Sequence, residues 1–227
     1  MKATGIRYSD PLSIAEDDRE ALRRFFLTDL PTPLSNTDEK GRRQLKMERD
    51  DKRRFLSYEL GHLTLKAALS TRDDEYPVYN KDTMVFQRAK AKRVIRECLA
   101  SIEAKYSEKA FSGNEHTAFI AEVASDLSEK LSRYLREGRF RIGAAQKLVN
   151  AHLKYLWTAG FCQEPPHCPI DGIIRDHAGI SYSWTRSDSI EEYSRAIEAL
   201  KRIASRRGRT LAQFELESFR RREDEEL

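Results

Sequence analysis

Two lysines and an asparagine interrupt an otherwise apolar stretch near the middle of this 227-residue chain. Lys147, Asn150 and Lys154 are spaced so that a helix of about 3.6 residues per turn places them on one face. A carboxylate, Asp171, follows a proline-rich loop after that stretch. A buried lysine amine can act as a nucleophile, and a carboxylate can stabilise positive charge that develops in a transition state. Lys147 and Asp171 are therefore the candidate catalytic residues.

Each of these residues also has a purely structural interpretation, and the sequence leaves both open. Asp171 is placed to cap a helix that begins at Gly172. Lys147 can extend its ammonium group from an apolar helix into solvent. Asn150 can hold the 165–168 loop through a buried hydrogen bond.

The order of these segments is a glycine-containing turn, a helix bearing a lysine, a loop, and a Pro-x-Asp sequence. In this order the chain resembles the helix-hairpin-helix DNA glycosylases, and in particular the 8-oxoguanine DNA glycosylase branch. Gly143 matches the hairpin glycine, Lys147 the nucleophilic lysine, and Pro169-Ile170-Asp171 the Pro-x-Asp motif, whereas Ala145 stands where a second hairpin glycine is expected. The segment from Trp184 onward is also similar to prokaryotic proteins of this group, some of which look like phage-defence enzymes.

The resemblance implies a DNA glycosylase that removes a modified or damaged base, with DNA as partner, no cofactor, and a function in repair or in defence against phage with modified DNA. Because the hairpin match is imperfect, the monofunctional reaction is favoured over attack by Lys147. The free amides at the start of the central helix are expected to bind a phosphate. The residues expected to contact DNA or the extruded base are Gly143, Ala145, Arg139, Arg141, Asn150, Lys154, Trp157, Trp184 and Arg175, although the aromatic residues among them also suit a core.

Two other classes of function remain compatible with the sequence. The first is a helical protein that binds DNA without catalysis, and the second is a helical interaction protein with no nucleic-acid partner. Basic residues cluster at 40–54 and 206–209, which suits phosphate binding, but the net charge is only +4. Solvated helix faces would explain the same clusters.

The cysteine and histidine content argues against a disulfide framework and against a metal site. Three cysteines cannot all pair in one chain. Cys162, His167, Cys168 and His177, with His152, do not follow a common zinc spacing. Neither a signal-peptide pattern nor a long apolar run is present. A cytoplasmic protein without a metal or a membrane segment is therefore expected, and no oligomeric state is specified.

Hydrophobic residues make up 39% of the chain, which is enough to form a core, and their spacing is helical throughout. The fold is predicted to be all-α, with about eight helices in a single domain over residues 1–227. Within this domain the sequence also allows a division into two lobes, residues 1–110 and residues 111–227. The ranges predicted as helical start after Ser13 and include 38–68, 84–106, 114–137, 143–159, a segment after Asp171, a segment after Asp188, and a last one after Thr210.

Overall fold

The computed structural model describes residues 39–70 and 73–218, and every regular element in these two ranges is helical. Seven α-helices and two short 3₁₀ helices are present there, and the described residues form no β-strand. The prediction of an all-α fold is therefore confirmed. The helix predicted after Ser13 lies outside the described residues.

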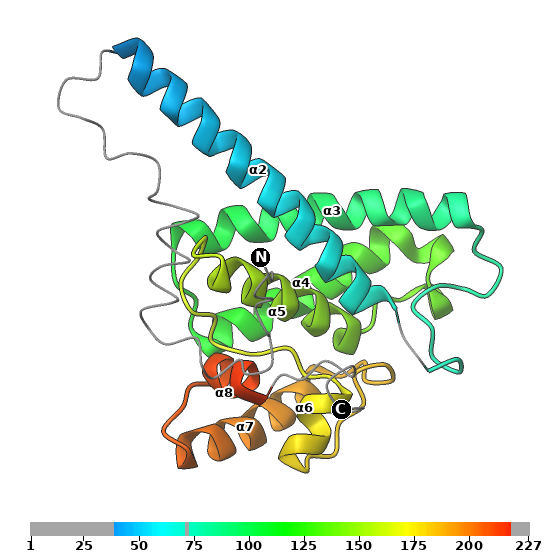
Figure 1. Ribbon diagram of the computed structural model, residues 1–227. Coiled ribbons are helices and arrows are strands. Elements are labelled where there is room, and N and C mark those ends of the chain that lie inside the picture. Colours follow the sequence, from blue (N-terminus) through cyan, green and yellow to red (C-terminus); the bar gives the residue numbers. More distant parts are fainter. Residues whose placement is uncertain (1–38, 71–72, 219–227) are drawn as a thin grey trace, which may run out of the picture.

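The helices follow one another along the chain as Figure 1 shows. In chain order they are α2 (Glu39–Leu69), α3 (Val85–Glu108), α4 (Gly113–Leu131), the 3₁₀ helices η1 (Ser132–Tyr134) and η2 (Arg136–Gly138), α5 (Ile142–Thr158), α6 (Gly172–Ala178), α7 (Ile190–Arg206) and α8 (Leu211–Ser218).

Helix α5 is the centre of the packing. It lies against α2, α3, α4 and α7, and residues 142–153 of this helix are all buried. In Figure 1, α2 to α5 form an upper group, whereas α6, α7 and α8 gather below it. A helix that is apolar nearly all round must be enclosed by other elements, and this enclosure brings neighbouring helices and loops to the polar side chains of α5.

Helix α4 is shorter than the sequence pattern predicts. It ends at Leu131 rather than near Glu137, and two 3₁₀ turns follow. The backbone is left-handed at Glu137 (φ 55°) and at Gly138 (φ 70°), which a continuing α-helix does not allow. The turn redirects the chain into α5, and the segment before it pairs with the 78–80 loop through the amides of Asn80 and Arg136.

The first half of α2 extends away from the rest of the molecule (Figure 1). Residues 46–55 are all exposed, and most of them are charged. The second half of this helix turns apolar and is buried against α5, with Leu65 and Ala68 in the core. The change from a charged to an apolar sequence therefore marks the point at which α2 joins the body.

Candidate functional site

The polar face of α5 meets the 169–171 segment as the sequence predicts. Lys147 forms an ion pair with the carboxylate of Asp171, 24 positions further along the chain. The side chain of Lys147 is 9% exposed and that of Asp171 is 30% exposed, so the carboxylate is the part of the pair that solvent reaches. The two candidate catalytic residues are therefore in direct contact.

Asp171 is also the N-cap of α6. Its Oδ1 accepts a hydrogen bond of 3.1 Å from the amide of Ile174, which is the capping geometry expected for an aspartate. Burial acts to raise the pKa of Asp171, but the ammonium of Lys147 and the hydrogen bonds from Lys147 and Ile174 outweigh it and hold the pKa below its usual value. The carboxylate is thus ionised at neutral pH and fixed by two elements.

Trp184 also contacts Lys147. The Nζ of Lys147 is 5.7 Å from the centroid of the Trp184 ring, within the range of a cation–π contact. Trp184 is only partly buried. Of the aromatic residues that the sequence suggested for holding a base, Trp184 is therefore brought to the ion pair. Trp157 is not, because it lies ten residues further along α5, about 15 Å by helical rise.

Gly143 serves packing and does not present a free amide. A Cβ added at this position would lie 1.9 Å from the carbonyl oxygen of Trp184, so only glycine allows the two backbones to approach. The amide of Gly143 donates to the carbonyl of Ser187 at 2.9 Å, and the amide of Ala145 donates to the carbonyl of Arg141 at 3.0 Å. The prediction that these amides are free to bind phosphate is wrong, and Ala145 is fully buried.

Arg141 is a structural residue. Its side chain is 6% exposed and donates to three carbonyls, those of Thr185 (2.8 Å), Tyr76 (2.9 Å) and Pro77 (3.1 Å). A phosphate-binding role for Arg141 is therefore wrong, because its donors hold the 76–77 loop and the 185 turn to the start of α5.

Two of the remaining basic residues are more accessible. Arg139 bonds to Asp188 at 2.5 Å yet is 60% exposed, and Arg175 bonds to Asp176 on its own short helix. Their predicted contacts with DNA stay predictions.

A second ion pair lies further along the same face of α5. Lys154 bonds to Glu215 of α8 at 2.9 Å, and the two side chains are 12% and 7% exposed. Burial raises the pKa of Glu215, and the charge of Lys154 offsets only part of that effect. Lys154 thus has a buried carboxylate partner, and their ion pair links α8 to α5. This contact accounts for a lysine on the buried face of α5 without any contact to DNA.

Asn150 belongs to a buried hydrogen-bond network. Its Oδ1 accepts from Nε2 of His116 (2.6 Å), and its Nδ2 lies within hydrogen-bond distance of the carbonyl of Cys168 (3.0 Å) and the hydroxyl of Tyr193 (3.1 Å). The hydroxyl of Tyr106 completes the chain at Nδ1 of His116 (2.5 Å). Asn150 is fully buried, so its predicted contact with DNA is wrong and its alternative role in holding the loop is confirmed.

The partners of Asn150 in this network were not among the predicted site residues. His116 and Tyr193 occupy positions that also suit the apolar faces of α4 and α7, where they are fully buried. A buried histidine needs partners for both ring nitrogens, and that requirement is the signal that could have linked His116 to Asn150. Burial lowers the pKa of His116 to about 4 and holds this ring neutral.

Within residues 39–70 and 73–218, no group of three or more histidine, cysteine or acidic residues is arranged to hold a metal ion. Cys98, Cys162 and Cys168 are all free thiols. None of the described helices combines the length and the apolar character that a membrane span requires.

Comparison with known proteins gives no relative for this chain: no family model matches it, and neither the curated proteins nor the solved structures contain a significant match.

Proposed function

We propose that this chain is a DNA glycosylase that hydrolyses the N-glycosidic bond of a modified or damaged base, with Asp171 as the catalytic carboxylate. The observation that carries the proposal is the ion pair between Lys147 and Asp171, in which the carboxylate is ionised and partly exposed and the ammonium also contacts the half-buried Trp184. The resemblance of the segment around these residues to glycosylases supports the same assignment, and defence against phage with modified DNA is the biological setting that it suggests.

The chemistry follows from the charge of Asp171. As the base departs with the electrons of the glycosidic bond, positive charge grows on the sugar, and a fixed carboxylate stabilises it. Water then adds to the sugar carbon and loses its proton, and the base gains one. A base removed in this way must first leave the stack, and we assign its contact to Trp184 because this ring is partly exposed and close to Lys147.

The ion pair favours the monofunctional reaction. An amine must be uncharged to attack the sugar, whereas Lys147 is bonded to an ionised carboxylate. We therefore assign Lys147 to positioning Asp171. Borohydride should then trap no covalent complex between enzyme and DNA, and a trapped complex that Lys147→Met abolishes would reverse this assignment.

The test is base release from a panel of modified and unmodified DNAs, measured by chromatography of the free base. Asp171→Asn should lower release roughly 100- to 1,000-fold. Asparagine keeps the cap of α6 but leaves the ammonium of Lys147 without its carboxylate, so circular dichroism of the variant is measured beside its activity. Asp176→Asn is the matched control, since it removes an exposed carboxylate from the same helix. Equal activity of the two variants, or no release from any DNA by the parent, would refute the proposal.

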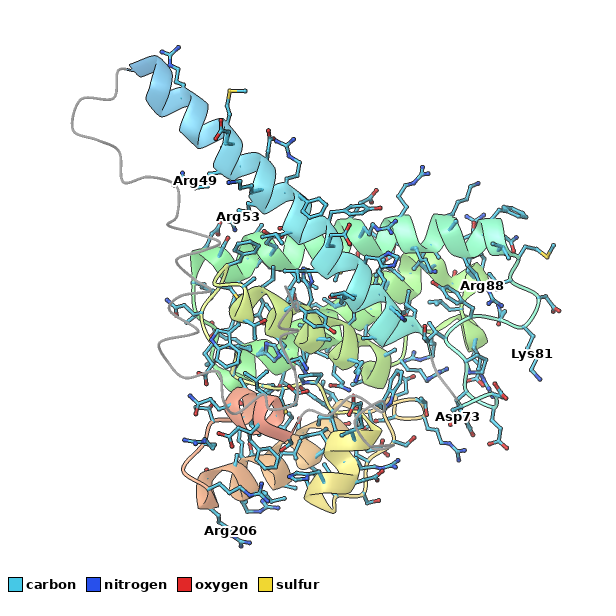
Figure 2. All side chains as sticks on the ribbon, viewed as in Figure 1. Arg49, Arg53, Asp73, Lys81, Arg88 and Arg206 are labelled. Atoms are coloured by element: carbon cyan, nitrogen blue, oxygen red, sulfur yellow. The ribbon has the colours of Figure 1, made fainter. Side chains whose placement is uncertain are left out.

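The second candidate function is DNA binding without catalysis, and the exposed part of α2 favours it. Arg49 lies on the exposed half of this helix (Figure 2), and Lys46 and Lys52 are exposed there too. Phosphate contacts of this kind weaken steeply with salt. Salt-sensitive retention on DNA without base release would select this function, and no retention at low salt would exclude both candidates.

A further inference from the structure

A hollow of about 740 Å³ lies between the second half of α2, the 73–81 loop and α3, and its lining is strongly basic. Cationic side chains outnumber carboxylates there by five to two, and the cations are Lys66, Lys81, Arg88, Lys92 and Arg96. Figure 2 shows Lys81 and Arg88 at this edge of the molecule, near Asp73. Asp73 is already paired with Arg186, so it neutralises less of the pocket.

The cations of this pocket are not committed to ion pairs. Among the described residues, none of the five has a carboxylate within 4.0 Å, in contrast to Lys147 and Lys154 in the interior. The charges on its walls therefore repel one another unless an anion enters.

Two polar atoms of the lining residues are buried and unpaired among the described residues. The hydroxyl of Tyr79, a residue that is 7% exposed, has no hydrogen-bond partner in the part of the chain that the structure describes, and the same holds for Nε of Arg96. Buried polar atoms are nearly always paired in folded proteins. Arg88 lies over the Tyr79 ring at 5.6 Å and is held by a bond from its Nε to the carbonyl of Thr83.

The arrangement on α3 suits a repeating anion better than a single one. Arg88, Lys92 and Arg96 are four residues apart on one face, so their positions rise by about 6 Å each along the helix. This repeat is comparable with the distance between successive phosphates of a nucleic-acid strand. A compact anion such as inorganic phosphate would reach only part of the row.

We propose that this pocket binds successive phosphates of a single nucleic-acid strand through Arg88, Lys92 and Arg96. The inference rests on the proposed function only in taking nucleic acid as the source of the phosphates. Arg141 connects the two sites, because it bonds both to the 76–77 loop beside the pocket and to Thr185 beside Trp184. A strand held in the pocket would thus be separated from the Asp171 site by Arg141 and the 76–77 loop that it holds.

The test is fluorescence anisotropy of a labelled single-stranded oligonucleotide titrated with the full chain at several salt concentrations. Lys92→Gln with Arg96→Gln should weaken binding roughly 10- to 100-fold at low salt. The slope of log K against log salt should fall by about 1.4, since each lost contact to single-stranded phosphate removes about 0.7.

The matched control is Lys90→Gln with Arg93→Gln, which removes two exposed charges from the same helix outside the pocket. If both double variants weaken binding equally, the pocket is not the site. Lys81→Gln with Lys92→Gln, two exposed positions, repeats the test if loss of Arg96 unfolds the chain. A nucleoside triphosphate that binds at one saturable site, while the oligonucleotide does not bind, would overturn the assignment to a strand.

The same variants separate this inference from the proposed function. If the parent releases a base and the pocket variants keep the parent's KM and DNA affinity, only the pocket inference fails. If the parent binds the oligonucleotide through the pocket but releases no base, only the glycosylase proposal fails.

Discussion

The close approach of Gly143 to the Trp184 carbonyl makes Gly143→Ala the most diagnostic single substitution. A new Cβ would lie 1.9 Å from that oxygen and 2.7 Å from its carbon, so the two backbones must separate by about 1 Å. Overpacking of this kind costs about 1–3 kcal/mol, and loss of the bond from Gly143 to Ser187 adds about 1 kcal/mol. The higher helix propensity of alanine returns up to about 1 kcal/mol.

The net expectation is a fall of about 2–3 kcal/mol in the free energy of unfolding, or about 4–12 °C in Tm for a chain of this size. Thermal unfolding followed by circular dichroism measures it. Gly172→Ala is the matched control: its Cβ would meet nothing closer than the tip of Arg175 at 4.0 Å, so Tm should stay constant or rise slightly. A Gly143→Ala protein as stable as its parent would refute the close-packing explanation of this glycine.

Two further results are expected from the buried polar groups. Arg141→Met should lower the free energy of unfolding by about 3 kcal/mol in urea titrations, because three carbonyls lose their donor. Arg139→Ala should change the same free energy by less than about 1 kcal/mol, because Arg139 is exposed. Similar losses for the two variants would contradict the structural role assigned to the buried Arg141. The pKa values of His116 and His152 are lowered to about 4 by burial. The unfolded chain therefore binds protons from about pH 6.5 downward before the folded one does, and stability should fall by about 1.4 kcal/mol per pH unit for each histidine between pH 6 and 4. Urea titrations across this range that show a flat profile would contradict the neutral state of both rings.

Much of the architecture follows from local patterns that the sequence displays directly. Ser112 and Glu115 form a capping box at the start of α4, and Thr210 and Gln213 bond reciprocally at the start of α8, as their spacing implies. The contact between Lys147 and Asp171 was predictable for a similar reason. The loop after α5 returns directly to the polar face of that helix, and Asp171 is the carboxylate that it carries there. The nearly buried ammonium group of Lys147 therefore has few other possible partners.

The role of Gly143 was not predictable because the partner backbone, at Trp184, lies 41 positions away in an irregular loop. The same applies to Arg141, whose sequence position suggested a surface contact while its acceptors are carbonyls at 76, 77 and 185. A backbone carbonyl carries no sequence signature, since every residue has one. Contacts of side chains with distant backbone therefore emerge only from the assembled fold.

The hydrogen-bond network around Asn150 also determines which ring nitrogen of His116 carries the proton. Because the amide group of Asn150 donates towards Cys168 and Tyr193, its oxygen must accept, so His116 carries its proton on Nε2 and accepts at Nδ1 from Tyr106. That imidazole proton lies at the junction of α4 and α5 and cannot reach water while the junction is closed. Its rate of exchange with deuterium in solution therefore reports how often α4 and the loop at Cys168, three residues before Asp171, separate from α5.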